Sequence, residues 1–527
     1  MSKFFGQVKT SFREDIEPNE ILLDRLAKRK EEEFGLSEKK FETPLFKRVI
    51  EGLFVFSVLV LFLLFAKTFQ LQVVKNKDFL AQAEANKFIY YKIRAERGVI
   101  YDQNLNQLVF NEPSFDLILE KNKLPSSESE RSAVLTEVAN ILKTNPEELK
   151  GKVEGSKDFQ ALISENLDNP TMIILETKIK DLPGFKVENN TRRQYIDGEV
   201  FSQIMGYNGK ITSEELANDS ELYSIFYYVG RAGIEKTYEE VLRKNSGETQ
   251  IERDAKGNII SRETISLPEP GKSLVLWLDS DLQKKITETL ANELKAVGSL
   301  HGSAVALDPQ TGGVLAMVSL PSFDNNAFSQ GDAEEIGKIL SDKKEPLFNR
   351  VVSGQFPTGS TIKPLIAASA LEEKIISSEK KIYSPGFIEV PNRYDPEIIY
   401  QRLDQAPHDW YDMRKAIAFS SNVYFYTVGG GYKDQRGLGP TKIKKYLELF
   451  GWGEKTNIDF PSESRGLIPS PAWKEEVKKE GWWDGDTYNL SIGQGNLLTT
   501  PLQVATAFLP LANGGRLLQP QVVKEII

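Results

Sequence analysis

"GQFPTGSTIKPLIAASAL", residues 354–371, joins a turn of small and rigid residues to a continuous apolar run. The Pro-Thr-Gly segment at 357–359 is typical of a turn, and the apolar run predicts a buried helix. Ser360 therefore stands at the N-terminus of this helix, where backbone N–H groups and the helix dipole favour a developing negative charge. Lys363 follows one turn later on the same face. The stretch predicts either a capped helix beside a surface lysine or a nucleophile with its base.

Lysine is the base that this pattern offers, because histidine is nearly absent. The chain has 2 histidines, His301 and His408, and 0 cysteines, which disfavours a Ser-His-Asp triad and excludes thiolate chemistry. A lysine in a dry site loses affinity for its proton and can then activate a serine. The other Ser-x-x-Lys matches lie in Lys/Glu-rich surroundings, which are typical of a solvated face.

Two further stretches carry polar residues in unusual places. "AIAFSSNVYFY", residues 416–426, holds Ser420 and Asn422 inside an apolar run. A hydroxyl and an amide buried there need hydrogen-bond partners, and functional sites usually keep such groups. "LSIGQGNLLTTPLQVATAF", residues 490–508, places a Gly-Gln-Gly turn before a helix that a Thr-Pro pair opens.

The composition is that of a folded, multi-domain protein. At 527 residues the chain is too long for one ordinary core, and shares of 40% hydrophobic and 27% charged residues exclude a disordered protein. The net charge of -9 argues against a nucleic-acid binder, which needs a basic face. Too few histidines are present for a histidine-rich metal centre, and we expect no metal and no cofactor.

An uncharged apolar segment near the N-terminus predicts a membrane span. The sequence GLFVFSVLVLFLLFA at 52–66 and its flanks give about twenty residues between 49 and 70, the length that a bilayer requires. A buried core helix is disfavoured because helices apolar all round are rare, and a signal peptide because the preceding charged arm is too long. Basic residues crowd the N-terminal flank, so the positive-inside rule places residues 1–48 in the cytoplasm.

The rest of the chain predicts an α+β organisation. Residues 96–111 are typical of two strands around a polar turn, and residues 124–190 of an α+β insertion. A Leu-Pro-Glu-Pro-Gly linker sets a domain boundary at about residue 270. Beyond it we expect a strand at 274–279, a helix at 280–297, a hairpin at 303–319, and apolar helices at 361–372, 413–428 and 499–513.

Together these stretches resemble the penicillin-binding proteins, serine acyl-transferases in which Ser-x-x-Lys is a signature. The likeness covers nearly the whole chain and is greatest to the class B, high-molecular-weight members, especially the elongation-type penicillin-binding protein 2 subgroup. In the first half it rests on Arg97-Gly98-x-Ile100-x-Asp102, Arg192-x-x-Tyr195 and Gly233-Ile234-Glu235-Lys236-x-Tyr238-Glu239. In the second half it rests on Asp308-Pro309-x-Thr311-Gly312, Pro321-Ser322-Phe323-Asp324-x-Asn326, Asn349-Arg350, Ile458-Asp459-Phe460-Pro461 and the stretches quoted above.

The resemblance implies a domain plan within the α+β class. It comprises a cytoplasmic tail at 1–48, a transmembrane signal anchor at 49–70, an extended non-catalytic pedestal domain of the dimerisation type at 71–270, and a transpeptidase domain at 271–527. In the last domain, helices lie on both sides of an antiparallel sheet. The protein would be a single-pass cell-membrane protein with a cytoplasmic N-terminus and an extracytoplasmic catalytic domain.

The resemblance also assigns roles in catalysis. Ser360 is the acylated nucleophile and Lys363 its base, while Ser420 passes a proton toward the leaving D-alanine and Asn422 holds a substrate amide. The donor is a D-Ala-D-Ala stem peptide of peptidoglycan, the acceptor is the amine of a neighbouring stem, and β-lactams trap the same serine.

The remaining implications concern the substrate and the partners. Gly493, Gln494 and Gly495 are expected to contact the substrate. The expected partners are the cytoplasmic membrane, a glycosyltransferase and other membrane proteins of the elongation complex, with no nucleic acid.

One family motif does not occur in the sequence. Lys-Thr/Ser-Gly, which supplies a cation for the substrate carboxylate and lies beside the oxyanion site, should follow the Gly-Gln-Gly turn, but the chain stops at Ile527 without it. We therefore expect a transpeptidase domain truncated at its C-terminus. The alternatives are a catalytically impaired, anchored scaffold or substrate-binding protein of the elongation complex, and a β-lactamase or β-lactam sensor. The intact serines, lysine and asparagine favour the enzyme, and the long pedestal disfavours a β-lactamase.

Overall fold

The structure is a computed structural model that describes residues 28–29, 47–77, 88–93, 95–155, 160–212, 214–215, 228–243, 247–253, 259–392, 394–395 and 397–527. The chain divides into two compact units, Met1–Lys87 and Phe88–Ile527. Nearly all of the predicted cytoplasmic tail at 1–48 lies outside the described residues.

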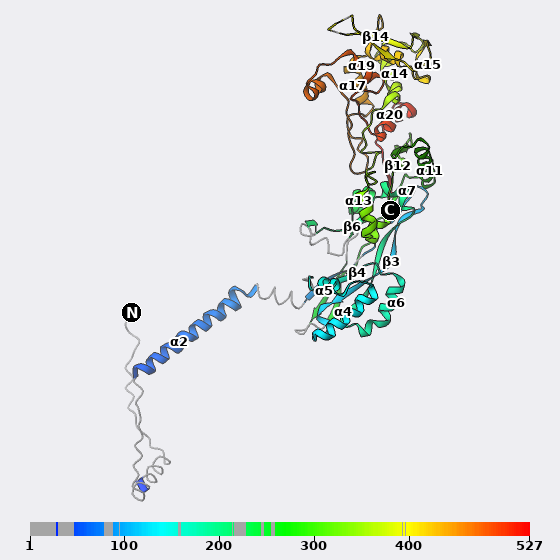
Figure 1. The fold of residues 1–527 in the computed structure, drawn as a ribbon. Helices are drawn as coiled ribbons and strands as arrows, with labels where there is room; N and C mark the ends of the chain where they lie inside the picture. The colour runs from blue at the N-terminus through cyan, green and yellow to red at the C-terminus, as the bar shows by residue number, and fades with distance from the viewer. Residues whose placement is uncertain are drawn as a thin grey trace, which may run out of the picture. The chain divides into compact units, whose positions relative to one another are not determined.

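The first unit contains a long apolar helix. α2 (Lys47–Phe69) continues into a π-helical turn, η1 (Gln70–Val74) (Figure 1). The helical segment at 50–74 is long and apolar enough to cross a membrane, and 0% of its most apolar 18 residues are buried inside the protein. The helix predicted at 49–70 is therefore confirmed, while its insertion into a membrane and its orientation stay predictions.

A long antiparallel pair of strands runs through the first half of the second unit. β3 (Gln107–Glu120) pairs with β5 (Phe185–Tyr195). β2 (Ile100–Tyr101) pairs with the beginning of β3, and β4 (Gln160–Ser164) with its end. β2, β3 and the turn between them confirm the two strands predicted at 96–111.

Helices pack on this sheet around a separate hydrophobic core. They are α4 (Glu128–Leu142), α5 (Pro146–Gly155) and α6 (Asn169–Lys178), drawn in cyan to blue-green near β3 and β4 in Figure 1. The core is made by residues that include Leu119, Leu135, Val138, Leu149 and Leu175. The α+β insertion predicted at 124–190 is confirmed.

The other elements of this half are short. They are β1 (Phe88–Ile93), α7 (Gly198–Met205), β6 (Asn208–Lys210), β7 (Tyr228–Gly230), α9 (Gly233–Thr237), α10 (Glu239–Leu242), β8 (Gly247–Arg253), β9 (Ile259–Ser266) and 3₁₀ turns at Lys121–Lys123 and Ile179–Asp181. β1, β8 and β9 form a three-stranded antiparallel sheet, and β6 pairs with β7.

Charged residues from three sequence motifs meet in a buried cluster. The carboxylate of Glu235, which is 0% exposed, accepts hydrogen bonds from Nε of Arg97 at 2.7 Å and Nε of Arg193 at 2.8 Å. The motif comparison singled out Arg192, but its neighbour Arg193 makes the buried contact. These ion pairs hold the segments around residues 97, 193 and 235 together.

One sheet joins the two halves of the second unit. β10 (Leu274–Leu276) pairs in parallel with β2 and antiparallel with β17 (Val523–Ile526). The resulting six-stranded sheet has the order β17-β10-β2-β3-β4, with β5 also paired to β3. Strands from both sides of residue 270 therefore share this sheet, and the domain boundary at that residue stays a prediction.

A helix and a hairpin follow β10, as predicted. α11 (Ser280–Val297) begins at Asp279, whose side chain accepts a hydrogen bond from the backbone of Leu282. β11 (Gly302–Leu307) and β12 (Val314–Leu320) form an antiparallel pair. The periodic apolar positions of the helix and the turn residues between the strands explain both predictions.

The rest of the second half is mainly helical. Its helices are α12 (Asn326–Gln330), α13 (Ala333–Ser341), the 3₁₀ turn η4 (Gly359–Ile362), α14 (Lys363–Glu372), α15 (Met413–Ala418), α16 (Asn422–Gly430), α17 (Gly439–Leu449), α18 (Pro471–Trp473), the π turn η5 (Lys474–Lys478), α19 (Asp484–Ser491) and α20 (Pro501–Asn513). Two short strand pairs accompany them: β13 (Ile382–Ser384) with β16 (Asp409–Tyr411), and β14 (Phe387–Pro391) with β15 (Ile399–Leu403).

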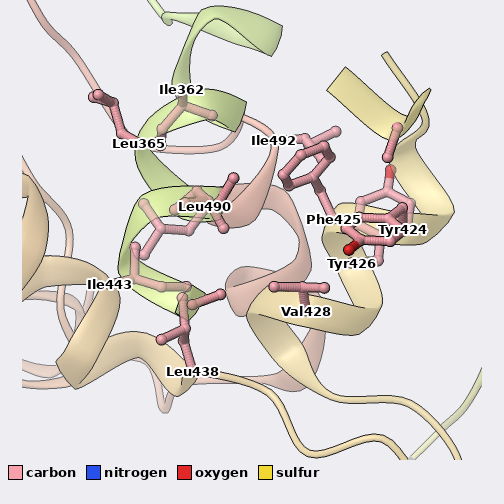
Figure 2. Close-up of a cluster of buried hydrophobic side chains, with 14 of the residues drawn as sticks. Ile362, Leu365, Tyr424, Phe425, Tyr426, Val428, Leu438, Ile443, Leu490 and Ile492 are labelled. Carbon is pink, nitrogen blue, oxygen red and sulfur yellow. The ribbon is translucent and has the colours of Figure 1, made fainter. Parts of the chain in front are cut away.

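These helices share one hydrophobic core. Figure 2 shows Leu365 of α14, Phe425 and Val428 of α16, and Ile443 of α17 around Leu490 of α19. Burial of large apolar side chains is the main stabilising contribution to such a core. The core fixes α14 against α16, and the predicted site residues lie at the N-terminal ends of these two helices.

The helix predicted at 413–428 is wrong in one respect, because it is interrupted. Ser420 has a φ of 55°, in the left-handed region that ends a right-handed helix. Ser421 then begins α16 as its N-cap, accepting a hydrogen bond from the backbone of Tyr424. The apolar pattern continues across the interruption, so periodicity alone does not reveal it.

Candidate active site

Ser360 and Lys363 lie on adjoining turns at the start of α14. Ser360 is in the 3₁₀ turn η4 and is solvent-exposed, while Lys363 is the first residue of α14 and is only 1% exposed. The predicted helix at 361–372 is confirmed, and its first turn is tighter than an α-helix. This arrangement presents a hydroxyl to solvent and buries an amine behind it.

Hydrogen bonds connect all four predicted catalytic residues. Nζ of Lys363 lies 2.7 Å from the backbone oxygen of Ser420, 3.0 Å from its Oγ and 2.8 Å from Oδ1 of Asn422. Oγ of Ser420 lies 2.8 Å from Oγ of Ser360. Ser420 thus links Lys363 to the exposed Ser360. It lies in the short interruption between α15 and α16.

Burial changes the proton affinity of Lys363. It lowers the pKa of this amine to about 8, although the negative charge of Asp404 acts in the opposite direction. The ring of Phe425, whose centroid is 5.7 Å from Nζ, forms part of the apolar surroundings. A substantial fraction of the amine is therefore neutral near pH 8, as a general base requires.

Asp404 is a residue of the candidate site that the sequence analysis did not single out. Its carboxylate accepts hydrogen bonds from Oγ of Ser421 at 2.6 Å, the backbone of Asn422 at 2.7 Å and the backbone of Val423 at 3.0 Å. Burial disfavours its charge, but these bonds outweigh burial and hold the pKa of the carboxyl below its usual value. Asp404 thereby fixes the N-terminus of α16 and the position of Asn422.

No short motif contains both Asp404 and Ser421. Asp404 directly follows β15, and the strand β16 and the helix α15 separate it from Ser421 in the sequence. A helix that starts at Asn422 needs an acceptor for its first backbone N–H groups, but the apolar pattern at 413–428 predicts an uninterrupted helix and gives no sign of this start. The sequence does not say which of the surrounding acids supplies it.

The Gly-Gln-Gly turn lies against the segment that carries the nucleophile. The backbone N–H of Gly359 donates to the oxygen of Gly493 at 2.9 Å. Gly493 has a φ of 74°, and a Cβ there would lie 2.1 Å from the oxygen of Gly359, so only glycine fits. Gln494 and Gly495 follow on the exposed side of this turn. Substrate contact by these three residues stays a prediction.

The part of the chain that the structure describes contains no set of side chains suited to bind a metal ion. Within those residues, no group of three or more His, Asp or Glu side chains could hold a metal ion. The arrangement that is present can instead move a proton between two hydroxyls and an amine, at an exposed oxygen next to a helix N-terminus. That is the chemistry of acyl transfer to a serine.

Comparison with known families agrees with this chemistry. The model of the penicillin binding protein transpeptidase domain matches residues 302–527, and that of the penicillin-binding protein dimerisation domain matches residues 92–276. The peptidoglycan D,D-transpeptidase MrdA of Acinetobacter baumannii is 32% identical over 489 residues, covering 91% of this chain and 70% of the relative. MrdA of Escherichia coli K12 is 29% identical, covering 92% of this chain and 75% of the relative.

Solved structures give the same result. The complex between penicillin-binding protein 2 and MreC from Helicobacter pylori matches with a TM-score of 0.71 and 27% identity, over 83% of this chain and 80% of that chain. Penicillin-binding protein 2 of Pseudomonas aeruginosa in complex with WCK 5153 matches with a TM-score of 0.59 and 28% identity, over 83% and 73%.

Proposed function

The chain belongs to the class B penicillin-binding proteins of the elongation-type, penicillin-binding protein 2 group, and we propose that it cross-links peptidoglycan through an acyl-enzyme on Ser360. The observation that carries this proposal is the hydrogen-bonded series from the buried Lys363 through Ser420 to the exposed Ser360. A scaffold has no need of such a series, whereas a serine nucleophile without histidine depends on one.

Acylation begins from the neutral amine of Lys363. Its two N–H groups match the two pure acceptors beside it, the backbone oxygen of Ser420 and Oδ1 of Asn422. Its lone pair then accepts the hydroxyl proton of Ser420, and Oγ of Ser420 accepts that of Ser360. As Oγ of Ser360 bonds to the carbonyl carbon of the penultimate D-alanine, one proton passes to Ser420 and another from Ser420 to the amine.

The leaving group and the acceptor use the same route in opposite directions. When the C–N bond to the terminal D-alanine breaks, Ser420 gives a proton to the departing amine and recovers one from Lys363. The amine of a neighbouring stem peptide then attacks the ester and loses a proton through the same residues. The new amide is the cross-link, and Ser360 regains its hydroxyl proton.

Two groups of residues would hold the substrate during these steps. We assign contact with the bound peptide to Asn422, whose backbone N–H donates to Asp404, and to the turn at 493–495, which accepts a hydrogen bond from the backbone of Gly359 next to the nucleophile. Positioning of this kind lowers the entropy cost of the reaction. β-Lactams would acylate the same hydroxyl.

The same family membership supports our proposal for the location and the partners. We place residues 1–48 in the cytoplasm, the anchor at 49–70, the pedestal at 71–270 and the transpeptidase domain at 271–527 outside the membrane. The partners are a glycosyltransferase and membrane proteins of the elongation complex, in keeping with the Helicobacter pylori complex that contains MreC. A reporter fused after residue 300 should be active only outside the cytoplasm, and cytoplasmic activity would overturn this topology.

Fluorescent penicillin tests the central proposal. In membranes from cells that make the protein, it should label the wild type and not Ser360→Ala, with both proteins present in equal amounts. Ser341→Ala, which alters another Ser-x-x-Lys match on the exposed end of α13, is the control and should label normally. Labelling of Ser360→Ala would exclude this nucleophile, and no labelling of the wild type would favour the scaffold.

A further inference from the structure

Gln503 is a buried amide in the first turn of α20, and none of the roles given above uses it. The residue is 0% exposed. Its Nε2 donates to the backbone oxygens of Glu454 and Arg465, both at 2.8 Å. Its Oε1 accepts from the backbone N–H of Thr500 at 2.9 Å. One side chain therefore joins three segments of the chain.

Helix capping explains only one of these contacts. Oγ1 of Thr500 accepts in turn from the backbone N–H of Gln503 at 3.1 Å, so the two residues form a capping box at the start of α20. A glutamate would complete this box equally well, because only an acceptor is needed. The two bonds from Nε2 need the donor that glutamine has and glutamate lacks. They reach oxygens 38 and 49 residues earlier in the sequence.

Backbone pairing connects the segments that meet at this amide with the nucleophile. Leu467, two positions after one of the bonded oxygens, pairs with Leu498 through two backbone hydrogen bonds of 2.7 and 3.0 Å. The next residue, Thr499, pairs in the same way with Phe356 at 2.9 and 3.0 Å. Phe356 precedes Ser360 by four positions. The residues at 498–500 are thus fixed on both sides by the buried amide and pair with the nucleophile segment.

The nucleophile segment depends on this pairing for its position. Its side chains at 355–357 are solvent-exposed, so they pack little against the protein. Its backbone is bonded at Phe356 to Thr499 and at Gly359 to Gly493. A change in the course of residues 498–500 would therefore reach the segment that ends at the serine.

We propose that Gln503 is a positioning residue for acylation, because its side-chain amide fixes the segment before Ser360 and so keeps Oγ of that serine in reach of Ser420 and the substrate carbonyl. The inference rests on the proposed function, which makes Ser360 the nucleophile. Gln503 itself does not touch the reacting atoms. A misplacement of about 1 Å can lower a rate about 10²-fold. The pKa of Lys363 is set by burial and by Asp404, so loss of the amide should slow acylation without changing its dependence on pH.

Gln503→Leu removes the three side-chain hydrogen bonds, and Gln283→Leu is a closely matched control. Gln283 on α11 is 1% exposed, and its Nε2 also donates to two backbone oxygens, those of Val200 and Met317, both at 3.0 Å. Its Oε1 also accepts from a backbone N–H, that of Met317 at 2.8 Å. These partners lie in α7 and β12. Both variants lose the same set of bonds, but only Gln503→Leu loses them beside the nucleophile segment.

The first measurement is the limiting rate of acylation at saturating penicillin, on full-length protein that melts cooperatively, between about pH 6 and 9.5. Gln503→Leu should lower this rate by about tenfold to 10²-fold and leave the midpoint of the pH profile unchanged. Gln283→Leu should change neither. An unchanged rate in Gln503→Leu, an equal loss in both variants, or a shifted midpoint would overturn the positioning role.

Gln503→Glu separates positioning from capping. It keeps the acceptor for Thr500 but places an oxygen where Nε2 bonded to the oxygens of Glu454 and Arg465. Acylation should be slowed as in Gln503→Leu. Acylation at the wild-type rate would mean that the residue only caps α20. This variant also decides the question if Gln503→Leu does not fold.

Hydrogen exchange measured by mass spectrometry tests the positioning without catalysis. Gln503→Leu should speed exchange in the peptide that spans residues 354–360, where the amides of Phe356 and Gly359 are hydrogen-bonded. Gln283→Leu should speed exchange around Met317 instead. Unchanged exchange at 354–360 in Gln503→Leu would overturn the inference even if acylation slowed. A wild type that is not acylated would contradict the proposed function, while the exchange result would still decide whether Gln503 fixes this segment.

Discussion

The proposed role of Lys363 as the base predicts that acylation depends on pH in a defined direction. Burial lowers the pKa of its amine to about 8, and only the neutral amine can accept a proton from Ser420. The acylation rate with penicillin should therefore rise about tenfold per pH unit below 8 and level off above it. The measurement is the rate constant of acylation by penicillin at a series of pH values between about 6 and 9.5. A rate that does not change over this range would mean that Lys363 is not the base.

Removal of the Lys363 amine tests the same role through the acylation rate. Lys363→Ala should lower the acylation rate by about 10³-fold, within the range known for loss of a general base. Lys338→Ala on the exposed face of α13 is the control and should leave the rate unchanged. The measurement is the second-order rate constant for penicillin on folded protein, and a loss of less than about tenfold would contradict the role.

Ser420 combines a hydroxyl to which we assign proton transfer with an unfavourable backbone conformation. Its φ of 55° costs a residue with a Cβ about 1–2 kcal/mol, a cost that glycine avoids. Ser420→Gly should therefore be more stable than Ser420→Ala by about 1 kcal/mol, while both lose acylation by about 10²-fold or more. Denaturant unfolding and acylation rates measure the two effects. Normal acylation by either variant would exclude proton transfer through Ser420.

At the scale of the element, an aspartate accepts hydrogen bonds from the first turn of each of two successive helices, α15 and α16. Only one of these aspartates affects the pKa of Lys363. Asp404 accepts hydrogen bonds from the first two backbone N–H groups of α16, and its charge raises the pKa of Lys363, whereas Asp412 is the N-cap of α15 and accepts from the backbone of Lys415. Asp404→Asn removes a negative charge that raises the pKa of Lys363, so the midpoint of the acylation profile should fall by about half a unit or more. Asp412→Asn should lower stability by about 1 kcal/mol without moving that midpoint. A shared shift, or none, would exclude the electrostatic role of Asp404.

Features that depend on contacts between residues close in the sequence could be predicted, and features that depend on distant contacts could not. The membrane-type helix, α11 and the β11–β12 hairpin depend on local periodicity and turn residues, and they were predicted correctly. The four residues to which we assign catalytic roles each lie in a short motif, and the structure brings them together. Asp404 was not found, because its contacts with the start of α16 arise from tertiary packing, and no local pattern reports that packing. The left-handed Ser420 was hidden by an apolar run that continues across it.

At the scale of the whole molecule, long-range contacts tie the first half of the second unit to the second half. Oη of Tyr238 donates to Asp459 at 2.7 Å, and Oγ of Ser280 donates to Asp102 at 2.6 Å. Together with the pairing of β10 with β2, these bonds join segments on both sides of residue 270. Asp102 and Tyr238, two of the motif residues of the first half, therefore fix that half against the second.

The buried cluster around Glu235 provides the last prediction. Glu235→Ala would leave Arg97 and Arg193 buried without their shared carboxylate, which should lower the free energy of unfolding by about 3–5 kcal/mol. Glu112→Ala breaks the half-exposed pair with Arg192 and should cost at most about 1 kcal/mol.

The pH dependence distinguishes an ion cluster from simple packing. Burial opposes the charge of Glu235, but Arg193 and Arg97 outweigh it and hold the pKa of the carboxyl below its usual value. A carboxyl of this kind stabilises the fold above its unfolded pKa, and the stabilisation is lost as the pH falls through the folded value. The stability gap between wild type and Glu235→Ala, measured by denaturant unfolding, should therefore be constant from about pH 6 to 8 and shrink below about pH 4. A gap that does not change with pH would mean that the side chain acts by volume alone.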